Sequence, residues 1–238
     1  MLFDAHTHFG RLSFGRDDLS LDTLLGELDR HGIERALSAS LKGVYCDFAE
    51  GNDETLQAAR RHSQIVPLAT VDPRRHLGCA EEVARRAEQG FRALRVFPEA
   101  QGWPLEFLPF LNLLPLLAQH RMTLLVSAAA NGTATQLVRL LGDSGVAGVL
   151  LDVGYGAMAE AIAAARACPT LHIETHRINT PGGIEVLAGA VGPDRLLFGS
   201  EAPTCAIAPP LGMVRRADLP EPDRSRILGG NLAALLGM

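Results

Sequence analysis

The sequence predicts an α/β protein, a (β/α)8 TIM barrel that forms a single domain over residues 1–238. First, a short β-branched or Leu-rich segment, a turn and a longer amphipathic stretch at helical spacing follow one another from end to end. Second, the sequence holds eight such units in 238 residues, the usual length of a TIM barrel. Third, it has no linker rich in Pro, Gly or Ser, which favours one domain.

The expected strands are spaced as repeated βα units require. Successive starts lie roughly 22 to 32 residues apart, near the length of a βα crossover unit. A doubly wound open sheet has the same local pattern, so the closed topology rests on the count. No Gly-x-Gly-x-x-Gly follows a strand, which weakens a dinucleotide-binding alternative. The expected starts are near Leu2, Ile33, Ile65, Phe91, Met122, Gly148, Thr170 and Arg195.

Sequence signals also mark several of the helices between these strands. Gly32 and Gly90 are expected to end the helices that begin near Asp18 and Glu81, because glycine readily adopts the left-handed conformation of a C-terminal cap. A further helix is expected from Gly51 to Arg61, and Pro181 can start another.

Composition excludes several classes of protein. The formal charge is −5, from 22 Lys plus Arg and 27 Asp plus Glu, which gives no reason to expect nucleic-acid binding. The 47% of hydrophobic residues excludes a disordered chain. We expect no membrane span and no signal peptide, hence a cytoplasmic protein. The four isolated cysteines predict reduced thiols rather than a disulfide scaffold.

The first expected strand carries candidate metal ligands. Alternation along it places Asp4, His6 and His8 on one face. Two imidazoles that are two residues apart on a strand can reach one ion, and neutral imidazole is a common ligand of zinc. The carboxyl ends of the strands are where barrel enzymes build their active sites.

The last expected strand ends in a matching carboxylate, Glu201, before Pro203. In a closed barrel the last strand pairs with the first, which would bring Glu201 beside His6 and His8. Two His and one Glu, with one coordination position left open, form a known catalytic zinc set. The alternative for Glu201 is an N-capping or surface carboxylate.

Four segments in chain order resemble the metal-dependent amidohydrolase superfamily, and the resemblance spans essentially the whole chain. It is nearest to the branch that contains aromatic-acid decarboxylases and lactone hydrolases, and it implies a (β/α)8 barrel with a metal ion at the carboxyl ends of the strands. The segments are Asp4-x-His6-x-His8, Thr70-Val-Asp72-Pro73, Leu196-Leu-Phe-Gly-Ser-Glu201-x-Pro203 and Ile227-Leu-Gly-Gly-Asn231-Leu-Ala-Ala-Leu-Leu236.

This chain departs from the family pattern at three places. The family usually has a histidine at the end of the fifth strand, where residues 124–131 offer none. Another usually stands in a His-x-Gly context on the sixth strand, where this chain has Asp152-Val153-Gly154. The carboxylate of the eighth strand is normally aspartate and is Glu201 here. Only His6 and His8 carry over intact.

The seventh and sixth expected strands offer replacements. Alternation places His172, Glu174 and His176 on one face, so Glu174 and His176 could complete or support the site. Alternatively, His176 begins a loop and Glu174 pairs with an arginine. Asp152 ends an apolar run, where a carboxylate is costly unless paired or bound to a cation. It is expected to be a ligand or general base, or else a helix cap.

Substrate-binding candidates are Arg95, Arg177 and Trp103. Arg95 closes the fourth strand, and its planar fork would suit a substrate carboxylate if it points inward; a structural ion pair is the alternative. Arg177 could bind the same group. Trp103 lies in a loop and could cover a pocket or simply pack that loop onto the barrel.

Taken together, the sequence predicts a metal-dependent hydrolase of a small amide, ester or lactone. His6, His8, Glu201 and Glu174 are the expected ligands of a divalent ion, zinc before manganese or iron, which would activate a water molecule. Asp152 or His176 would take the proton. Modest loops suggest a shallow mouth, which a neighbouring subunit of a homo-oligomer could cover.

Two alternatives remain open. The first is non-oxidative decarboxylation of an aromatic or unsaturated acid, which also begins with a substrate oxygen on the metal. The second is a barrel that has lost catalysis and acts as a small-molecule binder or scaffold, as the absent fifth- and sixth-strand histidines would suggest.

Overall fold

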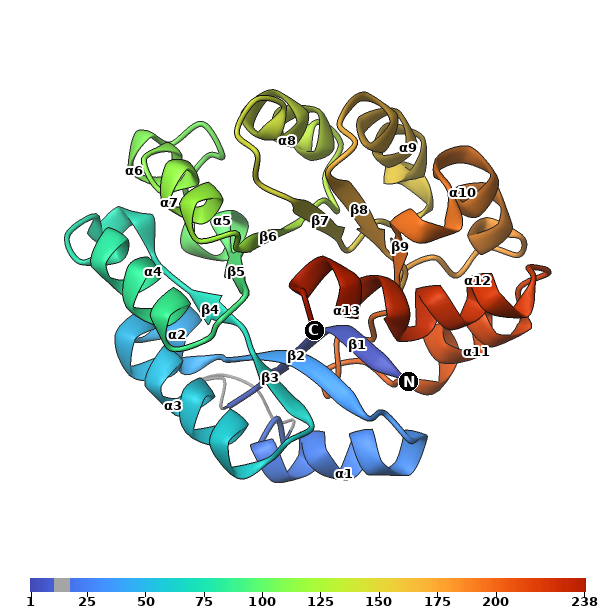
Figure 1. The fold of residues 1–238 in the computed structure, drawn as a ribbon, viewed down its shortest axis with the longest axis horizontal. Coiled ribbons are helices and arrows are strands. Elements are labelled where there is room, and N and C mark those ends of the chain that lie inside the picture. The colour runs from blue at the N-terminus through green and yellow to red at the C-terminus, as the bar shows by residue number, and fades with distance from the viewer. Residues whose placement is uncertain (11–17) are drawn as a thin grey trace.

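The computed structural model describes residues 1–10 and 18–238, and it is the predicted (β/α)8 barrel (Figure 1). Each expected strand is present and starts within two residues of its predicted position; the largest offsets are Ile33 against Arg35 and Phe91 against Ala93. The third barrel strand is divided into β3 and β4 around Leu68. The strands are β1 (Phe3–Phe9), β2 (Arg35–Ser40), β3 (Ile65–Pro67), β4 (Ala69–Thr70), β5 (Ala93–Val96), β6 (Thr123–Ser127), β7 (Gly148–Leu151), β8 (Leu171–Glu174) and β9 (Leu196–Leu197).

All strand pairs are parallel, and backbone hydrogen bonds close them into a cylinder. Strands β1 to β3 form one hydrogen-bonded sheet and strands β4 to β9 form the other. Leu68, between β3 and β4, donates its N–H to Ser38 O of β2 at 3.0 Å, and this contact links the two sheets. On the other side, a parallel bridge between Thr7 and Ala202 joins β1 to the segment after β9. The first and last strands are therefore neighbours, as predicted.

Helices surround the barrel (Figure 1). The expected left-handed caps are confirmed at Gly32, with φ 68°, and at Gly90, with φ 95°. Helix α3 begins before the expected Gly51, because the Asp47 side chain accepts the Glu50 N–H and caps it. The helices are α1 (Leu21–His31), α2 (Lys42–Tyr45), α3 (Phe48–Arg61), α4 (Cys79–Glu88), α5 (Pro98–Gln101), α6 (Leu108–Leu111), α7 (Leu114–Gln119), α8 (Thr133–Leu141), α9 (Met158–Ala167), α10 (Gly183–Val191), α11 (Ala208–Arg216), α12 (Glu221–Ser225) and α13 (Asn231–Leu236).

Apolar side chains pack in two main layers. The larger cluster fills the space between strands and helices. The smaller lies inside the barrel, where Phe3, Ala93 and Val149 near the strand starts meet Leu232 and Leu236 of α13. The carboxyl-terminal helix therefore closes the amino end of the barrel, which leaves the carboxyl end for a site.

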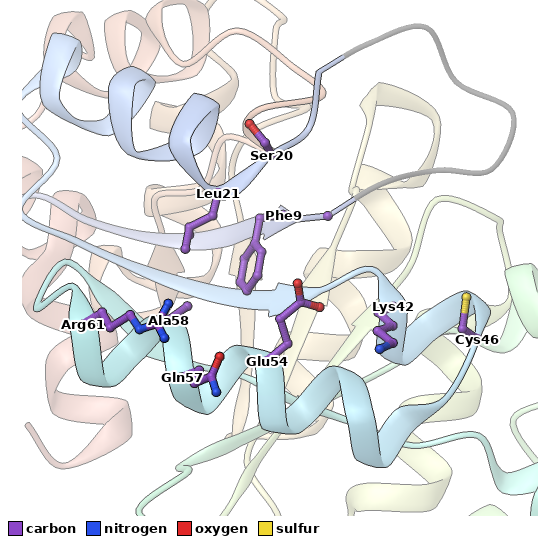
Figure 2. Close-up of a pocket in the computed structure, with 10 residues that line it drawn as sticks. Phe9, Ser20, Leu21, Lys42, Cys46, Glu54, Gln57, Ala58 and Arg61 are labelled. Atoms are coloured by element: carbon purple, nitrogen blue, oxygen red, sulfur yellow. The ribbon is translucent and has the colours of Figure 1, made fainter.

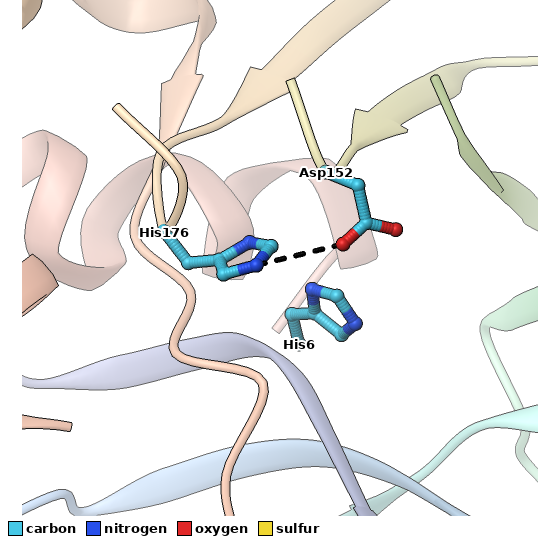
Figure 3. A group of neighbouring side chains, drawn as sticks. All are labelled: His6, Asp152 and His176. Carbon is cyan, nitrogen blue, oxygen red and sulfur yellow. Dashed lines mark ion pairs between the residues drawn. The ribbon is translucent and has the colours of Figure 1, made fainter. Parts of the chain in front are cut away.

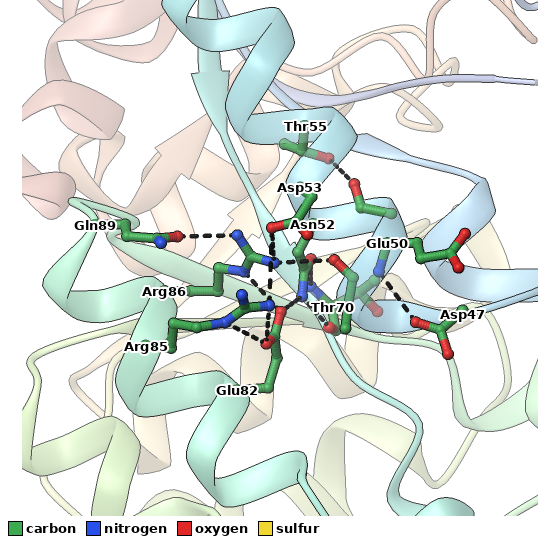
Figure 4. Close-up of polar contacts among 12 residues, drawn as sticks. Asp47, Glu50, Asn52, Asp53, Thr55, Thr70, Glu82, Arg85, Arg86 and Gln89 are labelled. Atoms are coloured by element: carbon green, nitrogen blue, oxygen red, sulfur yellow. Dashed lines mark hydrogen bonds and ion pairs between the residues drawn. The ribbon is translucent and has the colours of Figure 1, made fainter.

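A polar network joins α3, β4 and α4 (Figure 4). The wholly buried Arg86 donates to Glu82 Oε1 at 2.6 Å and to Asp53 Oδ1 at 2.6 Å. Asn52 Nδ2 donates to Thr70 O and to Glu82 Oε1. This network holds two neighbouring βα units together.

Within the described residues, none of the helices is both long enough and apolar enough to cross a bilayer.

Candidate metal centre

Three side chains, one from the first strand and two from the segments that follow two later strands, meet at the carboxyl end of the barrel (Figure 3). His6 comes from β1, Asp152 follows β7, and His176 follows β8. Each offers one possible ligand atom, and these atoms lie within 4.8 Å of one another. Imidazole and carboxylate at this separation form a set that a divalent ion can bridge.

Glu174 lies behind the two imidazoles, at the end of β8. Its Oε2 is 2.7 Å from His176 Nδ1 and 3.3 Å from His6 Nδ1, and its Oε1 accepts the His176 backbone N–H. The Nε2 atoms of both histidines are buried and have no hydrogen-bond partner among the described residues. Buried polar atoms without partners are costly, and a metal ion would satisfy both.

Two more carboxylates approach the free edge of His176. Its Nε2 lies 3.2 Å from Glu201 Oε2 and 3.5 Å from Asp152 Oδ1, in neither case with hydrogen-bond geometry. Both acids adopt positive φ, 61° at Asp152 and 62° at Glu201, which is uncommon for residues with a side chain. Asp152 makes no N-cap hydrogen bond to the following turn, so the helix-cap alternative does not describe it.

These acids dominate the electrostatics of the site. Burial acts to lower the pKa of His176, but Glu174 with Glu201 and Asp152 outweighs it and raises that pKa to about 10. Burial also opposes ionisation of Glu174, yet contact with His176 and His6 holds its pKa at about 2. Three carboxylates around two imidazoles favour positive charge at this point, and a divalent ion supplies it. The residues present thus fit a metal.

Strand β1 contains an irregularity between Asp4 and Thr7. Its register with β2 shifts there, and Phe3 and Ala5 belong to the interior cluster. Asp4 Oδ1 instead accepts the backbone N–H groups of His6 and Ser200. Burial raises the pKa of Asp4 to about 7. The alternation of side chains along the sequence does not by itself predict this register shift.

His8 lies near His6 at the carboxyl end of β1, but its side chain contacts a different residue. Its Nε2 lies 2.6 Å from Thr204 Oγ1, and His8 is not in the group of His6, Asp152 and His176. Burial lowers the pKa of His8 to about 3. No sequence pattern marked Thr204 as this partner, since it lies in the loop after the last strand.

Arg95 is the substrate-binding candidate that lies against the group. It is 7% exposed, stacks over Phe97 at 4.6 Å, and its Nε has no hydrogen-bond partner. No carboxylate among the described residues forms a salt bridge with it. Arg95 and Asp152 line the same pocket of about 160 Å³, with Phe97 and Ser127.

The other two candidates, Arg177 and Trp103, do not line the Arg95 pocket. Arg177 is exposed. Trp103 is buried, donates Nε1–H to Gln101 and packs on Phe110, so it holds its loop in place; it also lines a pocket of about 150 Å³ that shares Ser127 with the Arg95 pocket.

A larger pocket, of about 660 Å³, lies apart from these groups, between α1 and α3 (Figure 2). Phe9, Lys42 and Glu54 are among its lining residues. None of the three metal-group residues lines it, so its size alone does not mark it as the reaction site.

Solved structures with the same fold include aromatic-acid decarboxylases. The 5-carboxyvanillate decarboxylase of Sphingomonas paucimobilis is 16% identical, with a TM-score of 0.75 over 100% of this chain and 99% of that one. The 2,6-dihydroxybenzoate decarboxylase of Rhizobium is 14% identical, with a TM-score of 0.80 over 99% of this chain and 98% of that one. The 5-carboxyvanillate decarboxylase of Novosphingobium aromaticivorans is 14% identical, with a TM-score of 0.77 over 100% of this chain and 96% of that one. That structure is complexed with manganese and a nitrobenzoic acid.

Among curated proteins, none matches this sequence. The family model described as Amidohydrolase matches residues 3–238, nearly the whole sequence. This match agrees with the barrel and with the resemblance carried by the first and last strands. The chain therefore belongs to the amidohydrolase family.

Proposed function

We propose that this protein is a metal-dependent decarboxylase of a small aromatic or unsaturated carboxylic acid. His6, Asp152 and His176 would hold one divalent ion through the two Nε2 atoms and a carboxylate oxygen. When bound, the ion supplies positive charge that polarises the substrate's oxygens. Manganese and zinc both accept such a ligand set, and manganese is present in a related decarboxylase structure.

The observation that carries this proposal is the unpaired guanidinium of Arg95. A buried arginine without a carboxylate partner is costly, and a planar carboxylate is the group it binds best. Since Arg95 shares its pocket with Asp152, a carboxylate held there lies next to the metal group. The pocket volume suits a compact acid.

Decarboxylation also requires a proton. The bond between the ring carbon and the carboxyl carbon breaks, its electron pair stays on the ring carbon, carbon dioxide leaves and a proton takes its place. We assign the relay of this proton to Glu201, because it lies beside His176 with a side chain that is 28% exposed. Contact with His176 holds the pKa of Glu201 at about 2, so its carboxylate is ionised and passes on a proton taken from solvent rather than storing one. Arg95 holds the substrate, and the surrounding apolar groups exclude water.

The test is carbon dioxide release from a panel of hydroxybenzoates by the manganese- or zinc-loaded protein. Arg95→Met should lower kcat/KM by about 10- to 100-fold, the value of one or two charge-assisted hydrogen bonds. Arg177→Met is the matched control and should have little effect. Acid binding without turnover in the unmodified protein would instead favour a barrel that only binds small molecules.

Hydrolysis of a small amide, ester or lactone is the second candidate. It is favoured by the carboxylates of Asp152 and Glu201, since either can accept a proton from an attacking water. Assays of carboxylated esters and lactones beside the hydroxybenzoates separate the two reactions. Turnover of the esters or lactones with no carbon dioxide release would replace decarboxylation by hydrolysis.

A further inference from the structure

Glu174 has an unusual position for a carboxylate in a metal-binding group. It is wholly buried, and both of its oxygens point at histidine nitrogens. Its Oε2 meets the Nδ1 atoms of His6 and His176, while its Oε1 meets the backbone N–H of His176. One carboxylate therefore contacts both imidazoles from the side opposite their Nε2 atoms.

We propose that Glu174 is a positioning residue that fixes the tautomer and the orientation of both metal-binding histidines. An ionised carboxylate only accepts hydrogen bonds, so each Nδ1 that faces it must carry the proton. Nε2 is then the ring atom of each histidine at which a cation can take the place of a proton. A carboxylate behind a metal-bound histidine commonly has this effect, but here one group serves two ligands. This inference rests on the proposed metal site.

The backbone beside β9 is shaped to admit this carboxylate. A side chain added at Gly199 would place its Cβ 2.6 Å from Glu174 Cδ and 2.7 Å from Cγ, far inside van der Waals contact. Glu174 cannot move away without losing its three hydrogen-bond contacts. The absence of a side chain at Gly199 is therefore part of the arrangement that orients His6 and His176.

Glutamine cannot replace Glu174 in this role. If the amide oxygen takes the place of Oε2, the amide NH₂ faces the His176 backbone N–H, which is also a donor. If the amide is reversed, its oxygen accepts the His176 backbone N–H and its NH₂ donates to both Nδ1 atoms, which favours the tautomer with the proton on Nε2. The first orientation leaves donors facing donors and the second protonates the metal-binding atoms, although the volume of the side chain is unchanged.

The experiment titrates metal-free protein with Mn²⁺ or Zn²⁺ by calorimetry. Glu174→Gln should weaken metal binding by about 10- to 100-fold. The matched control is Glu160→Gln, because Glu160 also accepts three hydrogen bonds, from Gly132 and Thr135, but outside the metal group. It should leave metal affinity unchanged. Glu174→Asp keeps the charge and should recover part of the affinity.

A spectroscopic measurement separates positioning from folding. In the zinc-loaded protein labelled with ¹⁵N-histidine, ¹H–¹⁵N correlation spectra should show Nδ1 protonated and Nε2 bound in His6 and His176. Glu174→Gln should shift or broaden those signals and leave His31 unchanged. If unmodified protein binds metal, but Glu174→Gln binds it equally well with the same spectra, this inference fails while the proposed metal site stands. If unmodified protein binds no metal, the proposed function itself fails.

Discussion

The two acids that approach His176, Asp152 and Glu201, both stand in left-handed backbone conformation. For a residue with a Cβ this conformation costs about 1–2 kcal/mol. Such strain is retained where the surrounding structure enforces it, and it is concentrated at functional sites. These backbone conformations direct both carboxylates at the His176 imidazole. The arrangement of the site is therefore kept at a cost in local backbone stability.

This conflict gives a prediction for Glu201. Glycine usually destabilises relative to alanine, but at φ 62° the order should reverse. Glu201→Gly should be more stable than Glu201→Ala by about 1 kcal/mol in urea unfolding, because only alanine keeps the Cβ clash. If the two variants were equally stable, or if Glu201→Ala were the more stable one, the backbone at Glu201 would not be strained.

At the scale of residues, the sequence indicated which residue types stand at the strand ends, but not which groups each side chain faces. Asp152, Glu174 and His176 could be selected as candidates from their places at strand ends. The division of roles could not, because it depends on which edge of each imidazole faces which acid. Gly199 carried a signal within the motif around Glu201, but its reason appears only when β8 and β9 are adjacent.

At the scale of elements, periodicity was a good guide to the strands and a poorer one to their irregularities. The register shift in β1 occurs beside Asp4, whose side chain accepts the backbone N–H of Ser200 from the other end of the chain, a contact that no local pattern contains. Helix limits depended on caps: Gly32 was recognisable, whereas the Asp47 cap of α3 was not identified.

The network between α3 and α4 gives the second prediction. Arg86→Leu should destabilise the protein by about 3–5 kcal/mol, because it removes a buried cation from Glu82 and Asp53. Arg85 also contacts Glu82, but its side chain is 44% exposed, so Arg85→Leu should cost less than about 1 kcal/mol. Urea unfolding measures both. Equal effects would show that burial of Arg86 adds nothing.

At the scale of the whole molecule, helix α13 determines which end of the barrel stays open. Leu232 is 1% exposed and packs inside the cylinder with Phe3 and Leu197. Leu232→Ala should cost about 2–5 kcal/mol, while Leu235→Ala, at a partly buried position, should cost much less. Chemical unfolding compares them. A negligible effect of Leu232→Ala would mean that α13 does not support the barrel.

Closure of the barrel was predictable from the count of units, and it is what brings His6 near residues from the far end of the sequence. The proposal depends most on the ion that His6, Asp152 and His176 are suited to hold.

The most direct test is metal analysis of protein purified without an affinity tag. We expect close to one divalent ion per chain, retained in His172→Ala, whose side chain lies on the same strand but outside the group, and lost in His176→Ala. A metal-free unmodified protein that gains no thermal stability from added manganese or zinc, or a His176→Ala variant with its full metal content, would contradict the account.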